Sequence, residues 1–144
     1  MNEAGLYADR LSVNVEIPKE ENLKLLAPEK DHKSVYAPMR YIQQGVLESS
    51  EERKKHRHAP RFAPAGQSTQ MIVGATAETD KDILYLSSAL YKGPTMRRVY
   101  YSGYISVNTY DKRLPALKQP PLVRENRLYQ ADWLMRFYQS RWRK

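Results

Sequence analysis

The chain has 144 residues and a formal net charge of +8 at pH 7, enough for one modest domain with a single core. It contains no cysteine, which excludes disulfides, thiolate metal sites and cysteine-ligated iron–sulfur clusters within this chain. No apolar run approaches the roughly 20 residues of a membrane span, and no charged-then-apolar leader opens the sequence. We therefore expect a cytoplasmic protein without a membrane segment.

The first predicted element is a strand over residues 10–17, RLSVNVEI. Apolar and polar residues alternate strictly there, which is typical of a strand with one buried and one polar face. We expect the polar side chains to face the concave side of a sheet and the apolar side chains to face helices. The polar residues are Ser12, Asn14 and Glu16, and the apolar ones are Leu11, Val13 and Val15.

A loop and a helix follow this strand. Residues 18–34 include two prolines and many charges, and they predict an irregular loop with one short helical turn. Residues 38–55 predict a helix, because apolar residues recur there at spacings of three and four. Pro38 suits the first turn of that helix.

Two further strands and two further helices are predicted in the second half. The strands span about 68–74 and 96–107, and Thr79 can cap the helix that lies between them. The final helix begins near residue 124 and carries a basic end that runs to about residue 143. Its predicted apolar seam consists of Leu128, Ala131, Met135, Tyr138 and Trp142.

The alternation of strands and helices predicts an α/β fold with about three parallel strands and flanking helices. Nothing N-terminal to residues 10–17 is predicted to cover the open side of that strand. Because an exposed sheet edge pairs readily with another chain, we expect self-association, or a partner that covers the edge. The chain then resembles one incomplete domain, part of something larger.

Polar residues recur on one face of the predicted strands. The second strand contributes Gln70 and Gly74, and the third contributes Tyr100, Ser102 and Tyr104. Buried parallel sheets are normally apolar on both faces, so this row favours the wall of a ligand site, as at the strand ends of α/β barrels. The alternative is an edge sheet with one face in solvent.

The positive charge is concentrated in three stretches of the chain, which are residues 53–61, 97–98 and 136–144. Such runs favour nucleic acid or another polyanion as a partner. The alternative is a basic surface with no assigned use. His56 and His58 also allow a zinc site, but a solvated basic run is the stronger interpretation of that stretch. The candidate nucleic-acid-binding residues are Arg53, Lys54, Lys55, Arg57 and Arg61.

Several segments taken in order resemble one enzyme superfamily. The segments are DRLSVNVEIP, LKLLAPEK, RFAPAGQSTQMIVGATAETDKDILYLSSALY, RRVYYSGYISVN and RENRLYQADWLMRFY. Together they resemble the C-terminal half of the radical S-adenosylmethionine (SAM) barrel, within the group assigned to DNA modification or repair. The resemblance implies that residues 1–144 form half of a (β/α)₆ core, with the fourth, fifth and sixth strands.

The resemblance also implies positions that contact the cofactor. In the superfamily the fourth strand approaches the ribose and methionyl part of SAM, a hydrophobe of the fifth packs on adenine, and the sixth meets the adenine edge. The fifth-strand pattern GxIxGxxE is matched only in part here, because Gln70 stands at its first glycine. The implied positions are Ser12, Asn14, Glu16, Gln70, Ile72, Gly74, Glu78, Tyr100 and Ser102.

The chain departs from the superfamily in one respect that decides its chemistry. The CxxxCxxC loop that holds the 4Fe–4S cluster is missing, so we expect no radical chemistry and no tight binding of SAM or the cluster by this chain alone. The implied partners are an N-terminal half that carries the cluster motif, nucleic acid, and a uracil-DNA-glycosylase-like protein. The alternatives to an enzyme fragment are a stand-alone basic module that binds nucleic acid and a structural module without catalysis.

Overall fold

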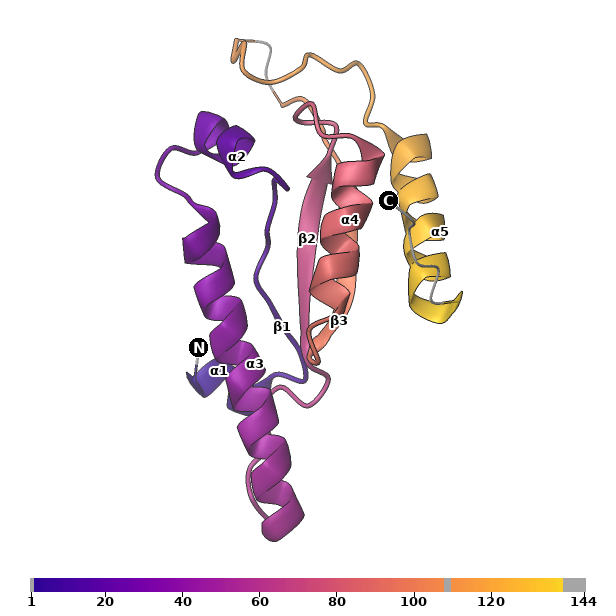
Figure 1. The fold of residues 1–144 in the computed structure, drawn as a ribbon. Coiled ribbons are helices and arrows are strands. Elements are labelled where there is room, and N and C mark those ends of the chain that lie inside the picture. The colour runs from indigo at the N-terminus through magenta and orange to yellow at the C-terminus, as the bar shows by residue number, and fades with distance from the viewer. Residues whose placement is uncertain (1, 108–109, 139–144) are drawn as a thin grey trace.

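The computed structural model describes residues 2–107 and 110–138. The elements are α1 (Asn2–Tyr7), β1 (Leu11–Ser12), α2 (Glu20–Leu26), α3 (His32–Lys55), β2 (Gln67–Val73), α4 (Asp80–Tyr91), β3 (Met96–Gly103) and α5 (Leu122–Tyr138) (Figure 1). The three strands form one open parallel sheet with helices beside it. The predicted α/β class with three parallel strands and flanking helices is confirmed.

The strands lie in the order β1-β2-β3, which is also their order along the chain. The central strand β2 pairs with β3 over its whole length, from Gln67 opposite Met96 to Val73 opposite Gly103. Parallel neighbours need a crossover, and α2 with α3 supplies the first while α4 supplies the second. Three parallel strands in sequential order occur in a partial barrel and also in one half of a doubly wound sheet, whose order reverses only between its halves.

Strand β1 is shorter than the predicted strand. Regular pairing with β2 covers Leu11–Ser12, and one further parallel bridge joins Glu16 to Met71. Between them the N–H of Val15 donates to the hydroxyl of Thr69 over 3.0 Å instead of to a carbonyl. Glu16 then takes a φ of 63°, which bends the chain away from ideal strand geometry. The chain follows β2 as predicted, but a side chain interrupts the ladder.

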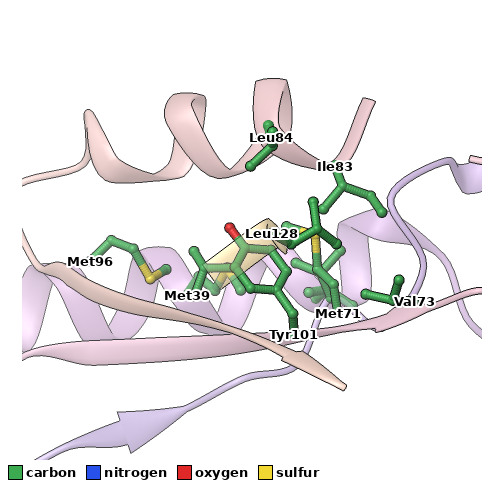
Figure 2. Close-up of a cluster of buried hydrophobic side chains, with 11 residues drawn as sticks. Met39, Met71, Val73, Ile83, Leu84, Met96, Tyr101 and Leu128 are labelled. Carbon is green, nitrogen blue, oxygen red and sulfur yellow. The ribbon is translucent and has the colours of Figure 1, made fainter. Parts of the chain in front are cut away.

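The main core lies between the sheet and the helices α3, α4 and α5 (Figure 2). Its buried members are Val15, Val35, Met39, Met71, Val73, Ile83, Leu84, Met96, Val99, Tyr101 and Leu128. Val13 packs against this cluster beside Val15, whereas Ser12 and Asn14 are exposed. The predicted alternation of these four residues is therefore confirmed, and the helices α3, α4 and α5 gather on one face of the sheet.

Helix α3 begins six residues earlier than predicted. Asp31 and Ser34 form a capping box, in which the Asp31 carboxylate accepts the N–H of Ser34 over 2.6 Å. Pro38 therefore lies inside the helix, and its predicted place in the first turn is wrong. Thr79 caps α4 through a second capping box, as predicted.

Helix α1 is not predicted by the sequence pattern, and it packs against an aromatic ring. Gly5 of α1 and Gly45 of α3 both lie against the ring of Phe62. Glycines at these positions let the two helices approach the ring closely. Helix α2 likewise extends over seven residues where one turn was predicted.

Helix α5 begins at Leu122, close to the predicted start. Its buried residues are Leu128, as predicted, and Asp132, which the predicted seam omits. The seam is wrong at Tyr138, whose side chain is 66% exposed. Trp142 and the basic end of the predicted helix lie outside the described residues.

Side chains close the outer edge of β3. The outward N–H groups of alternate residues donate to oxygens on α4 and α5 instead of to a further strand. The pairs are Val99 to the Tyr91 hydroxyl (2.9 Å), Tyr101 to the Tyr129 hydroxyl (2.9 Å) and Gly103 to the Glu125 carboxylate (2.7 Å). Covering an edge in this way prevents another strand from pairing there.

Candidate functional site

The face of the sheet opposite α3, α4 and α5 carries the predicted polar residues in rows across the strands. Gln70 lies opposite Tyr100 on β3, and Ser12 lies opposite Ser68. The hydroxyl of Ser12 donates to the Ser68 carbonyl over 3.2 Å, while Asn14 next to it is exposed. Hydroxyl, amide and phenol groups thus share one surface, and Tyr100 is 40% exposed there. These groups can exchange hydrogen bonds with a polar ligand.

Glu16 stands at the C-terminal edge of this surface with both backbone groups paired. Its N–H donates to the Gln70 carbonyl over 2.9 Å, and its carbonyl accepts the N–H of Ile72 over 2.8 Å. Its carboxylate forms an ion pair with Lys30, with 3.1 Å between Oε2 and Nζ. The backbone of Glu16 is therefore fixed, and its charge is already balanced within the chain.

Ile72 lies opposite Ser102, also on this face, in a small apolar cluster. The buried members of the cluster are Ile17, Leu23 and Ala75, with Leu26, Ile72, Tyr104 and Leu114 packed beside them. Helix α2 and residues 110–121 lie at the end of the sheet toward which β2 points (Figure 1). Ile72 is therefore partly covered by the chain's own loop and by α2.

Gly74 takes a φ of 90°, which favours glycine, immediately after β2. A Cβ added to Gly74 would lie 3.0 Å from Cγ of Pro121. The close approach that the glycine permits is therefore made by the segment leading into α5. The segment from β2 to α4 is a packing joint in this structure, and any ligand at the edge would lie beside Pro121.

The carboxylate of Glu78 is buried, with only 5% of the residue exposed. It accepts hydrogen bonds from the amide of Asn22 over 2.8 Å and from the hydroxyl of Thr76. The carbonyl of Glu78 accepts a hydrogen bond from Arg124 over 2.6 Å. Glu78 thus connects three parts of the chain, namely α2, α5 and the turn that precedes α4. Its carboxylate is hydrogen-bonded to neighbours in its own chain.

The predicted nucleic-acid-binding residues lie at the end of α3 and in the connection that follows it. Arg53 donates to the carbonyl of Ala59 over 2.5 Å, and Lys54 pairs with Glu51 over 2.6 Å. Lys55, Arg57 and Arg61 are exposed. Two of the predicted residues, Arg53 and Arg61, line a hollow that Arg97 also lines. The sequence pattern shows Arg97 only as part of a basic pair, because the hollow is lined by segments far apart in sequence.

A buried polar network that the sequence pattern does not reveal lies between β3, α4 and α5. The carboxylate of Asp132 is fully buried and accepts hydrogen bonds from the hydroxyls of Tyr91 (2.6 Å) and Tyr101 (3.1 Å). Arg136 donates to the other oxygen over 2.8 Å, and Arg98 lies 3.8 Å from it. Figure 2 shows Tyr101 rising from the sheet toward the helix that carries Ile83 and Leu84.

The network keeps its two phenols protonated. Burial, together with the hydrogen bond to Asp132, raises the pKa of Tyr91 above its ordinary value. Burial also raises the pKa of Tyr101. Both phenols therefore stay hydrogen-bond donors at neutral pH, which suits a network that stabilises a buried carboxylate by hydrogen bonds.

Within residues 2–107 and 110–138, no helix is long and apolar enough to cross a membrane. No group of three or more His, Asp or Glu side chains in the same described residues could hold a metal ion. Comparison with known proteins found no relative, since no family model, no curated protein and no solved structure matches this chain.

Proposed function

We propose that this chain is the C-terminal half of a radical SAM core and that the face of the sheet opposite its helices forms one wall of the SAM site. The observation that carries the proposal is the pair of polar rows across neighbouring parallel strands, Gln70 with Tyr100 and Ser12 with Ser68. An ordinary parallel sheet covered on both faces has no such rows. The sequential strand order, with α3, α4 and α5 against the opposite face, supports the same conclusion.

The donor set on this face fits the polar part of SAM. Ser12, Asn14 and Gln70 offer hydroxyl and amide groups to ribose hydroxyls and to the methionyl amino and carboxylate groups. Tyr100 and Ser102 complete the wall on β3, and the exposed ring of Tyr100 can stack on adenine. Glu16 contributes less than the resemblance implies, because Lys30 already neutralises its carboxylate.

The iron–sulfur cluster does not fit this chain. The sequence contains no cysteine, and the cluster of this superfamily is held by cysteine thiolates. The cluster ligands and the opposite wall of the SAM site would therefore come from an N-terminal half. We propose that half as the partner of this chain, in the cytoplasm, together with a nucleic-acid substrate and a uracil-DNA-glycosylase-like protein.

The test of the wall is weak but specific binding of SAM to this chain. We expect saturation-transfer NMR to detect SAM with a dissociation constant above about 100 μM, because half of the contacts are missing. Tyr100→Ala should remove the transfer, whereas Tyr85→Ala, which alters an exposed ring on α4, should leave it unchanged. Absence of transfer to the native chain, or equal transfer to both variants, would refute the proposed wall.

Nucleic-acid binding is a second candidate function, and one observation favours it. Lys55, Arg57 and Arg61 are exposed in one short stretch, and none of them takes part in an ion pair among the described residues. Unpaired cations of this kind bind phosphates by releasing counterions, so the affinity falls steeply with salt. Fluorescence anisotropy with labelled DNA at several salt concentrations tests the candidate, and an affinity independent of salt would reject it.

A further inference from the structure

A hollow of about 350 Å³ lies at the N-terminal ends of β2 and β3, away from the edge where Glu16 and Gly74 lie. The last turns of α3 extend past the sheet at this end (Figure 1). The side chains that line the hollow come from α3, from the connection before β2, and from the turn before β3 and the first residues of β3. They include Arg53, Arg61 and Arg97, which converge from three separate segments of the chain.

The positive charge in the hollow is not balanced by its lining. No carboxylate lines it, and in the part of the chain that the structure describes no ion pair involves Arg53, Arg61 or Arg97. Glu48 and Glu52 line a different hollow, on the side of α3 that faces α1. Three arginines without a carboxylate among them favour an anion as the occupant of this hollow.

Hydrogen bonds and backbone geometry fix part of this lining. Arg53 is fixed by its 2.5 Å hydrogen bond to the Ala59 carbonyl. Gly66 has a φ of 77°, and a Cβ there would lie 2.4 Å from the Thr95 carbonyl and 3.0 Å from Cγ of Arg97. The positive φ and the nearby Thr95 carbonyl therefore require glycine at this point, and the stem of Arg97 passes beside it. The hydroxyl of Thr95, 2% exposed, accepts a hydrogen bond from Gln67 over 2.8 Å and lines the hollow.

We propose that this hollow binds a phosphate group through Arg53, Arg61 and Arg97. The planar guanidinium group donates two parallel hydrogen bonds to phosphate oxygens, and such charge-assisted bonds are about twice as strong as neutral ones. Phosphate of a nucleic-acid backbone and phosphate of a small molecule share this chemistry. The inference deepens the nucleic-acid-binding candidate and does not depend on the SAM site.

The first experiment measures binding of inorganic pyrophosphate by calorimetry. Arg97→Gln and Arg61→Gln each remove one charge but keep an unbranched polar side chain, and Arg127→Gln is the matched control on an exposed position of α5. We expect each of the first two variants to weaken binding about tenfold and the control to change it less than about twofold. Equal losses in all three variants, or no loss in any, would overturn the proposal.

The second experiment separates the sources of phosphate, using a labelled single-stranded DNA of about 20 nucleotides. If the hollow binds the DNA backbone, Arg97→Gln weakens DNA binding and lowers the slope of log affinity against log salt by about one. If it binds small phosphates, the variant loses affinity for pyrophosphate alone, and the phosphate site stands. A third outcome is that Arg97→Gln leaves pyrophosphate binding unchanged and that only Arg57→Gln loses DNA binding. The chain would then bind nucleic acid elsewhere, and the proposed phosphate site in the hollow would be wrong. Equal thermal midpoints show that the variants fold alike.

Discussion

The hydroxyl of Tyr91 donates a 2.6 Å hydrogen bond to the buried carboxylate of Asp132. The oxygen of this Tyr91 hydroxyl also accepts a hydrogen bond from the N–H of Val99 over 2.9 Å. One side chain of α4 thus satisfies a buried charge on α5 and closes part of the outer edge of β3. A buried charge is costly unless every donor to it is in place. The relationship therefore fixes the positions of α4 and α5 against the sheet.

Replacing Tyr91 by phenylalanine keeps the ring and removes the hydroxyl. We expect the variant to lower the free energy of unfolding by about 2–3 kcal/mol, because Asp132 loses a donor and the N–H of Val99 loses its acceptor. Urea denaturation measures the change. Tyr85→Phe on the same helix is the control, since Tyr85 is 64% exposed and should change stability by less than about 0.5 kcal/mol. Equal effects of the two variants would contradict this account of the network.

The same network predicts a loss of stability in alkali. Burial and the hydrogen bond to Asp132 raise the pKa of Tyr91 in the folded state above its ordinary value of 10.0. The folded chain therefore holds this proton more tightly than the unfolded chain does. The resulting stabilisation is complete below about pH 10 and is lost as the pH rises beyond it. We expect the free energy of unfolding to fall less steeply above pH 10 in Tyr91→Phe than in the native chain, and parallel profiles would argue against the predicted linkage.

The α/β order could be predicted because each element carries its own periodicity. The alternation of Val13 and Val15 with Ser12 and Asn14 gives the faces of the first strand correctly. Its regular length could not be predicted, because the interruption depends on the hydroxyl of Thr69, which lies 54 positions further along the chain. Periodicity describes neighbours in sequence, and such a competing hydrogen bond comes from tertiary structure.

The same reason explains which parts of the site could be foreseen. The polar face of Ser12, Asn14, Gln70 and Tyr100 follows from period two alone. The burial of Asp132 does not, because an acid on a helix with several basic residues is ordinarily solvated, and its phenol partners lie on other elements. The local sequence pattern cannot reveal hydrogen bonds between side chains of different elements, and such bonds decide whether a polar residue is buried.

The packing of α1 and α3 on Phe62 gives a prediction with an unusual sign. Alanine normally stabilises a helix relative to glycine by about 0.5–1 kcal/mol. A Cβ at Gly45 would lie 2.7 Å from Cε1 of Phe62, so we expect Gly45→Ala to destabilise the native chain by about 1–3 kcal/mol. In a Phe62→Ala background the same change should become stabilising. A double-mutant cycle by urea denaturation measures both effects, and stabilisation in both backgrounds would exclude the proposed clash.

The two edges of the sheet differ in whether their backbone groups are paired. The outer edge of β3 is closed by side chains from α4 and α5. At the other edge the N–H groups of Leu11 and Val13 donate to the carbonyls of Gly66 and Ser68, so those of Ser12 and Asn14 point away from β2. Among the described residues no backbone carbonyl accepts from these two N–H groups. An open edge of this kind pairs with a strand of another chain.

We expect the chain to self-associate through β1, and we expect Asn14→Lys to weaken that association. A charged side chain on an edge strand opposes pairing with a second strand. The net charge of +8 also opposes association, but at physiological salt this repulsion extends only about 8 Å, whereas strand pairing acts at contact. Asn126→Lys makes the same change on an exposed position of α5 and raises the net charge equally. Analytical ultracentrifugation over a range of concentrations should show weaker association in Asn14→Lys alone. A native chain that stays monomeric throughout, or equal weakening by both variants, would show that β1 is not the edge through which copies meet.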